Sequence, residues 1–386
     1  MDKKEILALL NAETPVKRIE NLKMLLAQEK EAPQVRPQYA NNHIHTIYSF
    51  SPYSPTAAIY FARQAGLQTA GIMDHDSISG AGEFRQAGKV AGVATTCGLE
   101  CRINFDETPL KGRKTNNPDQ DGVSYMTVHS VPPEHYSALQ AIFAPLVAAR
   151  NVRNRKMVDN INREMAPFGI SIDFDKDVVP CSQFAVGGSI TERHLTWALA
   201  GKIMEYTGED GVVPFLRDKL GFKLSPKLIA NLESKEHLQY DILGVLKSSM
   251  IERIFVPATD ECLSLSEISA IAKKYDAILC YAYLGDVGES VTGDKKAEKY
   301  EDSYLEELFD VLSDAGVPGV TYMPSRNTEQ QIARLREQCR RHGIREISGE
   351  DINSPRQGFI CEKLAEPGFT HLVDAAWELV RREERD

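Results

Sequence analysis

Apolar runs that predict strands alternate with amphipathic stretches that predict helices in two parts of the chain. The first part predicts strands ending near residue 45 and over 68–73, 93–101 and 123–131, with helices over 54–66 and 80–91. The second part predicts strands over 277–283, 319–323 and 345–348, with helices over 303–315 and 328–342 and one that begins at Ser264. Ser264 and Thr328 each stand three residues before a Glu or a Gln, which is the capping-box pattern of a helix start. Such alternation is typical of an α/β protein.

Three further segments interrupt or precede this alternation. Residues 132–257 show helical periodicity almost throughout, which predicts an inserted helical subdomain. Residues 1–39 predict an N-terminal helical arm, because Thr14-Pro15 is a favourable start of a helix and an apolar stripe follows it. Residues 106–122 are rich in Asn, Pro and Gly, which predicts a hairpin-like excursion between two strands. The main domain would then comprise residues 40–131 and 258–386.

About seven strands alternating with helices favour an α/β fold in which a parallel sheet closes into a TIM-like barrel. Polar candidate residues follow the carboxyl ends of the predicted strands, where barrel enzymes place their chemistry. The alternative is a doubly wound open sheet, which would gather its ligands at one crevice.

Composition indicates the cellular compartment in which such a fold would act. The chain has 386 residues, of which 42% are hydrophobic, so it can bury a full core. No apolar run approaches the roughly 18 residues of a membrane span, and the first residues lack the apolar core of a signal peptide. The seven cysteines show no Cys-x-x-Cys spacing, which favours free thiols in a reducing compartment. We therefore expect a cytoplasmic protein without a membrane partner.

The net charge of −10 comes from 45 basic and 55 acidic residues. This balance disfavours a broad electrostatic contact with a long nucleic acid, whereas a small phosphorylated ligand stays compatible with it. No pattern in the chain points to a particular oligomeric state.

The candidate chemistry begins at His43-Ile44-His45. Two imidazoles one residue apart on a strand point to the same side and can bind one metal ion. Further potential ligands follow in order along the chain, namely His75, Glu100, His129, His194 and Asp351. Taken singly, each histidine could be an ordinary core or surface residue, but Glu100 lies among apolar residues and would be costly to bury without a metal or a cation. The ordered series favours ligands that converge at one barrel mouth.

These residues resemble the motifs of the polymerase and histidinol phosphatase (PHP) family of metal-dependent phosphoesterases over roughly residues 40 to 360. Asn42-His43-Ile44-His45-Thr46 resembles the opening His-x-His-Thr motif, and the further matches are Gly71-Ile72-Met73-Asp74-His75-Asp76, Gly98-Leu99-Glu100, Thr127-Val128-His129, Thr191-Glu192-Arg193-His194-Leu195 and Ser348-Gly349-Glu350-Asp351-Ile352-Asn353. The resemblance implies a distorted (β/α)7 TIM-like barrel. The helical insertion resembles that of the branch that acts on small nucleotides or oligonucleotides.

The resemblance also implies a ligand set for two metal ions. His43, His45, Glu100 and Asp351 would hold one ion, and Glu100 would bridge to a second ion held by His129 and His194. Two ions at about 3.5 to 4 Å can share a hydroxide that attacks phosphorus. Mixed imidazole and carboxylate ligands fit zinc, manganese or iron.

A third metal site of the family is where the chain departs from the resemblance. Of its ligands only His75 is a strong one here, because Phe50 and Asn353 stand at the other two positions. Asp74 or Asp76 could compensate, yet a neutral amide binds a divalent ion less well than imidazole or carboxylate. We therefore expect two divalent ions and no third.

The expected activity is hydrolysis of a phosphate ester, with a small, nucleotide-like phosphorylated substrate. Arg193 and Arg356 are candidate phosphate ligands, because a guanidinium can bind phosphate in a bidentate manner. For Lys247 and the basic residues around Arg153 we favour a solvated helix face. Two alternatives stay open, a non-catalytic metal- and nucleotide-binding sensor and a metal-dependent amidohydrolase.

Overall fold

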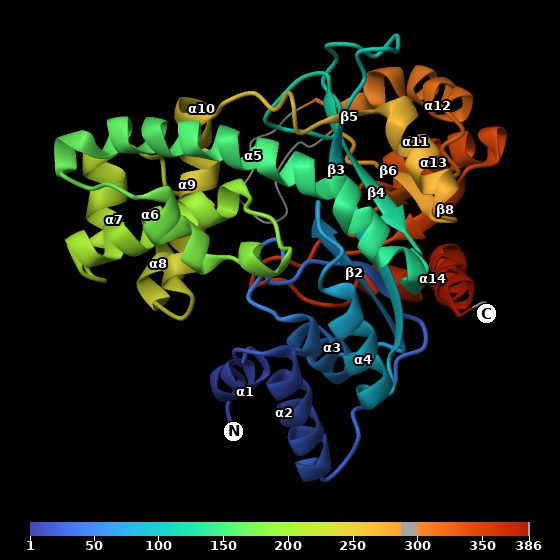
Figure 1. The fold of residues 1–386 in the computed structure, drawn as a ribbon, viewed down its shortest axis with the longest axis horizontal. Coiled ribbons are helices and arrows are strands. Elements are labelled where there is room, and N and C mark those ends of the chain that lie inside the picture. The colour runs from blue at the N-terminus through green and yellow to red at the C-terminus, as the bar shows by residue number, and fades with distance from the viewer. Residues whose placement is uncertain (287–298, 385–386) are drawn as a thin grey trace.

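The computed structural model describes residues 1–286 and 299–384, and a curled sheet lies at its centre (Figure 1). The neighbouring strands follow the order β1-β2-β3-β4-β6-β7-β8, and β5 pairs with β3. Their bounds are Asn41–Ile44 (β1), Thr69–His75 (β2), Ala94–Asn104 (β3), Val123–His129 (β4), Leu263–Ser264 (β5), Ile278–Ala282 (β6), Gly319–Tyr322 (β7) and Arg345–Ser348 (β8). The α/β class and the strands that the sequence predicts are confirmed.

One strand departs from the parallel sheet that we predicted. β4 runs antiparallel to both β3 and β6, whereas the other neighbouring pairs are parallel. The segment between β3 and β4 contains no crossover helix, and a chain that returns without one pairs antiparallel. The predicted hairpin-like excursion over residues 106–122 is thus the reason why a purely parallel sheet was the wrong prediction.

The two edges of the sheet meet, so that the sheet curls into a distorted barrel. Ile352, in the segment after β8, forms a parallel bridge with Ile44 of β1. The amide of His45 donates to the carbonyl of Ile352 at 3.0 Å, and the side-chain amide of Asn42 donates to the carbonyl of Ser348 at 2.8 Å. Gly349 permits this approach, because a Cβ there would lie 2.5 Å from the Cβ of His43.

Helices of the main domain pack against the sheet, and all but the last of them begin where the sequence predicts; no helix was predicted over residues 370–383. The helices are Pro55–Gln64 (α3), Ala81–Ala91 (α4), Leu265–Lys274 (α11), Leu305–Asp314 (α12), Glu329–His342 (α13) and Thr370–Glu383 (α14). Ser54 caps α3, and the predicted capping boxes at Ser264 and Thr328 are both present. The capping side chains thus fix where these helices begin. The core between the helices and the sheet is apolar.

Residues 132–257 fold into helices that lie to one side of the barrel (Figure 1). The helices are Tyr136–Met165 (α5), Glu192–Thr207 (α6), Val212–Pro214 (α7), Pro226–Ser234 (α8), Leu238–Ser249 (α9) and Ile251–Ile254 (α10), with short turns between them. The long helix α5 belongs to both parts: Phe143 packs in the barrel core, whereas Ile161 packs in a second hydrophobic cluster formed by residues 157–254.

The N-terminal arm consists of Lys3–Leu10 (α1) and Pro15–Gln28 (α2), and it packs on α3 and α4. Thr14 caps α2 as predicted. A buried ion pair joins Arg18 of α2 to Glu83 of α4 at 2.6 Å. Among residues 1–286 and 299–384, no helix combines the length and the apolar character that a membrane crossing requires.

Candidate metal centre

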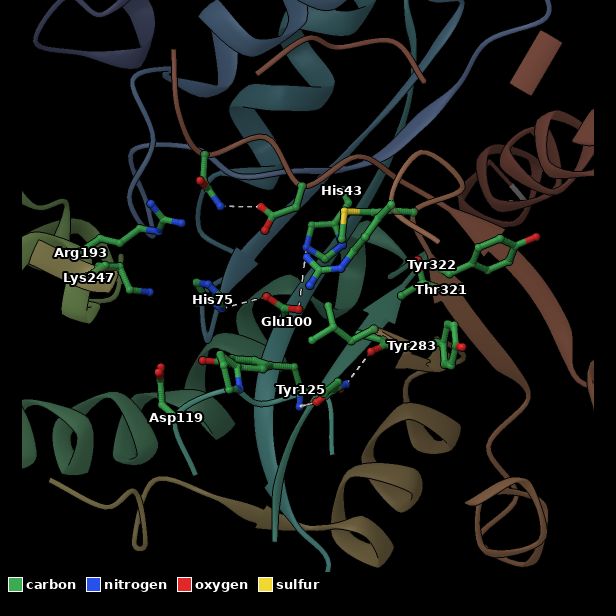
Figure 2. A pocket seen from close by; sticks show the side chains of 18 of the residues that line it. His43, His75, Glu100, Asp119, Tyr125, Arg193, Lys247, Tyr283, Thr321 and Tyr322 are labelled. Atoms are coloured by element: carbon green, nitrogen blue, oxygen red, sulfur yellow. Dashed lines mark hydrogen bonds and ion pairs between the residues drawn. The ribbon is translucent and has the colours of Figure 1, made fainter. Parts of the chain in front are cut away.

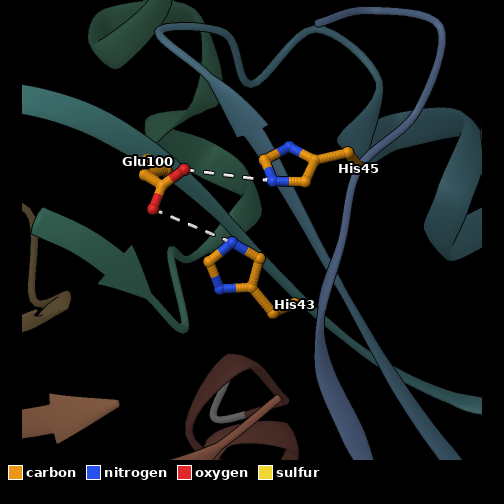
Figure 3. Close-up of side chains that lie close together, drawn as sticks. All are labelled: His43, His45 and Glu100. Carbon is orange, nitrogen blue, oxygen red and sulfur yellow. Dashed lines mark ion pairs between the residues drawn. The ribbon is translucent and has the colours of Figure 1, made fainter. Parts of the chain in front are cut away.

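His43 of β1, His45 directly after β1 and Glu100 of β3 converge. Glu100 presents Oε1 at 3.8 Å from Nε2 of His43 and Oε2 at 3.9 Å from Nε2 of His45 (Figure 3). All three side chains are buried. In the part of the chain that the structure describes, they form the only group of three whose ligand atoms lie within 4.8 Å of one another. The donors are spaced so that one ion could bind all three.

His75, at the end of β2, joins this group instead of standing apart. Its Nδ1 lies 3.0 Å from Oε2 of Glu100, and its ring stacks on that of His45 with centroids 4.6 Å apart. The pairing of β2 with β3 places His75 directly opposite Glu100. A residue that the resemblance assigns to a third site is therefore in contact with the expected bridging carboxylate.

Asp351 completes the group from the opposite edge of the sheet. Its Oδ1 lies 3.3 Å from Nε2 of His45. Burial alone would raise the pKa of this carboxyl, but the hydrogen bond and the charge of His45 hold it well below the usual range. Burial alone would likewise lower the pKa of His45, and Asp351 raises it. The two groups thus form an ion pair that an incoming cation would have to replace.

His129, the last residue of β4, is fully buried, and neither ring nitrogen has a hydrogen-bond partner among the described residues. Burial, followed by the charge of His43, lowers the pKa of His129 to about 3. Buried polar atoms normally have a partner, so this neutral imidazole is suited to bind a metal ion. We regard His129 as the observation that best supports a second metal position.

His194 lies in the first turn of α6, in the helical insertion. Its Nδ1 accepts a hydrogen bond from the backbone N–H of Thr191 at 3.0 Å and lies 3.3 Å from Oγ1 of the same residue. Burial lowers its pKa to about 3. Because Nδ1 accepts this hydrogen bond, the proton of the neutral ring lies on Nε2. Nε2 could bind a metal only if the proton moved to Nδ1 and the hydrogen bond from Thr191 were given up.

The residues at the expected third site are engaged elsewhere. Phe50, with a φ of 118°, packs its ring edge-on against His194 at 5.0 Å. Asn353 donates from Nδ2 to Oδ1 of Asp351 at 2.6 Å. Asp74 accepts three hydrogen bonds from Thr46 and Ser49, and Asp76 pairs with Arg150 at 2.7 Å. The side chains at these positions are thus already engaged in contacts within the protein.

A cavity of about 450 Å³ opens between the barrel mouth and the insertion, and His43, His75, Glu100 and Asp351 line it. Figure 2 shows Arg193 of α6 and Lys247 of α9 reaching toward the centre of the cavity from the same side. Sequence reasoning missed Lys247, for which we favoured a solvated face, because its position depends on how the insertion docks. It also missed Tyr125, although this residue follows the period of two from His129 along β4.

The two candidate phosphate ligands lie in different surroundings. Arg193 lines the cavity, and no described residue forms an ion pair with its guanidinium. Arg356 forms a bidentate pair with Asp241 at 2.7 and 2.8 Å and is not among the lining residues. The guanidinium of Arg193 is the better placed of the two for an anion.

The favoured solvated face around Arg153 is wrong for Arg153 itself. Its side chain is buried and contacts the carboxylates of Glu192 and Glu261, whereas the neighbouring Arg155 is exposed and pairs with Asp175. Arg153 lies on the side of α5 that faces α6 and the chain leaving the insertion. The guanidinium of Arg153 is therefore buried between α5, α6 and the chain that leaves the insertion.

No family model and no curated protein sequence matches the chain. Two solved structures share its fold. A protein from Bifidobacterium adolescentis, named for a proposed metal-dependent phosphoesterase activity, superposes with a TM-score of 0.59 at 20% identity, over 92% of this chain and 99% of that one. An amidohydrolase from Chromobacterium violaceum, with bound sulfate and no metal, gives a TM-score of 0.56 at 17% identity, over 87% and 96% of the two chains. The chain thus has the barrel fold of these two proteins.

Proposed function

We propose that the protein is a metal-dependent phosphoesterase that hydrolyses a small phosphate ester, with a nucleotide or a short oligonucleotide as the favoured substrate. The observation that carries this proposal is the convergence of His43, His45 and Glu100 at a cavity that also receives Arg193. Ligands for a cation and a guanidinium for an anion face the same space. The motif resemblance to the PHP family, and to its branch with a helical insertion, supports the same assignment.

The proposed ligand roles follow the geometry described above. His43, His45, Glu100 and Asp351 would hold one ion, and Glu100, His129 and His194 would hold the second. This mixture of imidazole and carboxylate suits zinc, manganese or iron. When bound, two such ions acidify water and stabilise the oxygens that enter and leave phosphorus.

The chain's own residues would bind and orient the ester. Arg193 would bind the phosphate group, and Lys247 would add positive charge from the same side of the cavity. Phe255 and Ile251 of the insertion would cover the apolar part of the substrate and exclude water. Recognition of the substrate would therefore fall mainly to the insertion, and most of the proposed metal ligands, all except His194, would come from the barrel.

The test is a substrate screen on protein depleted of metal and then supplied with manganese, zinc or iron. We expect hydrolysis of phosphomonoesters or phosphodiesters of nucleotides, lost on chelation and restored by the metal. An Arg193→Ala variant should raise KM for the same substrate, because it removes a phosphate ligand without touching the metal ligands. Turnover of amides without turnover of phosphate esters would contradict the proposal.

Two observations favour other functions. One structural neighbour is named an amidohydrolase, so cleavage of C–N bonds is the second candidate and the same screen tests it. The replacement of third-site ligands by Phe50 and Asn353 favours a sensor that binds metal and nucleotide without turnover. A metal-loaded protein that binds phosphate compounds and hydrolyses none would establish the sensor.

The seven free cysteines fit action in the reducing cytoplasm.

A further inference from the structure

Six charged side chains are buried together where the insertion meets the barrel, and we call them the interface network. They are Asp76, Arg102, Arg150, Arg153, Glu192 and Glu261, and none is more than 6% exposed. Three arginines face three carboxylates, so the formal charges cancel. Burying a charged side chain without an oppositely charged partner is costly. Each member of the network must therefore keep its partner, and few arrangements of the six side chains satisfy this condition.

Two arginines from different parts of the fold share the same two carboxylates. Arg102 of β3 lies 2.6 Å from Glu192 of α6 and 2.7 Å from Glu261, in the chain that returns from the insertion. Arg153 of α5 contacts both of these carboxylates as well. The barrel strand, both helices and the returning chain are therefore joined through two shared anions.

The third arginine extends the network to the strand that carries His75. Arg150 of α5 lies 2.7 Å from Asp76, which directly follows His75, and 3.3 Å from Glu261. Figure 1 shows α5 extending from the insertion toward the barrel, and the pair of Arg150 with Asp76 joins the two parts.

Members of the network lie one or two residues from the candidate ligands. Arg102 lies two residues after Glu100 and so shares its face of β3. Glu192 precedes Arg193 by one residue and His194 by two, in the first turn of α6. A displacement of Glu192 would move both residues that the insertion contributes to the cavity.

From this placement we propose that the interface network positions His194 and Arg193 against the barrel, and that it thereby sets the affinity of the second metal position. This inference rests on the proposed function. Glu192 is the central positioning residue, because it alone connects Arg102 and Arg153 to the turn that carries His194. Outer contacts of this kind typically change metal affinity by about 10- to 100-fold when they are removed.

The test compares Glu192→Gln with a matched change elsewhere. Glu83 is also buried and pairs with Arg18 of the N-terminal arm at 2.6 Å, so Glu83→Gln makes the same chemical change in another buried ion pair. Binding of zinc to metal-depleted protein is followed by calorimetry, with thermal unfolding of each variant beside it. We expect both variants to lose thermal stability, and Glu192→Gln alone to weaken the second of two ions by about 10- to 100-fold.

A double variant, R153Q/E192Q, removes one charge of each sign and keeps the network neutral, so it tests the same affinity if Glu192→Gln alone does not fold. Parent-like affinity for both ions in the Glu192 variants would overturn the inference, as would equal weakening in Glu83→Gln. Either result would leave the proposed function standing as long as the parent protein binds two ions and hydrolyses a phosphate ester. A parent protein that binds no metal would instead contradict the proposed function, and the inference with it.

Discussion

Glu100 is the residue on which the candidate centre depends most. His43, His45 and His75 all approach its two oxygens, from two neighbouring strands. A carboxylate so placed can neutralise two cations at once, whereas the amide of glutamine is neutral.

Glu100→Gln is therefore expected to lose at least one of two bound ions and any hydrolytic turnover. Metal content by elemental analysis, on protein purified in excess manganese or zinc, measures this directly. The exposed Glu233 offers the matched control, and Glu233→Gln should keep the full metal content. Full occupancy in Glu100→Gln would remove Glu100 from the ligand set.

The buried histidines predict how the metal-free protein responds to acid. Burial lowers the pKa of His43 to about 4 and that of His129 and His194 to about 3, from an ordinary value of 6.5. Between that value and the lowered ones, the unfolded chain binds protons that the folded protein does not bind, so the free energy of unfolding falls as the pH falls. Burial also lowers the pKa of His75, which adds to this trend. Asp351 raises the pKa of His45, and burial raises the pKa of Glu301 and Glu383 to about 7, so these three groups oppose it.

Urea unfolding of the metal-free protein at about pH 7.5 and about pH 5.5 should therefore give the lower midpoint at the lower pH. His129→Gln removes one of the titrating groups, so the difference between the two midpoints should shrink. A difference between the midpoints that is the same in His129→Gln as in the parent protein would contradict the burial of a neutral His129.

At the scale of elements, the segment from His45 to Phe50 connects the barrel ligands to the insertion. Asp74 holds it, accepting from the amide of Thr46 at 2.7 Å, from Oγ1 of Thr46 at 2.6 Å and from Oγ of Ser49 at 2.6 Å. The segment ends where Phe50 packs on His194.

Asp74→Asn is expected to destabilise the protein by about 1.5–3 kcal/mol, because hydrogen bonds to a buried charged group are weakened or lost. Denaturant unfolding measures this loss. The number of bound metal ions should not change, because the carboxylate is occupied by Thr46 and Ser49. Loss of an ion in Asp74→Asn, with folding intact, would assign Asp74 to a metal site.

Elements that local chemistry determines were predictable from the sequence. Ser54, Ser264 and Thr328 begin helices because their side chains accept from backbone nitrogens three residues away, and a motif of four residues carries that information. The reversed direction of β4 was not predicted, because it depends on how the preceding loop returns. The burial of Arg153 was not predicted either, since its partners Glu192 and Glu261 lie far along the chain and meet it only when the insertion docks.

At the scale of the whole molecule, the net charge of −10 contrasts with the cations that line the cavity. Arg193 and Lys247 offer positive charge within one concave site, whereas a duplex needs a basic surface along its length. A small ester and a long nucleic acid should therefore behave differently.

We expect no binding to a duplex of roughly 30 base pairs even at low ionic strength, where phosphate contacts are strongest. Fluorescence anisotropy with a labelled duplex tests this, with a labelled mononucleotide as the comparison on metal-loaded protein. Tight binding of the duplex that weakens with salt would contradict the expectation and would point to a basic surface outside the cavity.

The meeting of the sheet edges also sets the order of events when the chain folds. Asn42 and Ser348, which join next to the centre, are 306 residues apart in sequence, and the ligands His45 and Asp351 meet across the same seam. Closing so long a loop is slow, because the entropy of closure must be lost before the contact is gained. On the ribosome, the chain emerges with His43 and His45 early and Asp351 late, so the candidate centre can be complete only near the end of synthesis. Tight and correct metal binding thus belongs to the last step of folding.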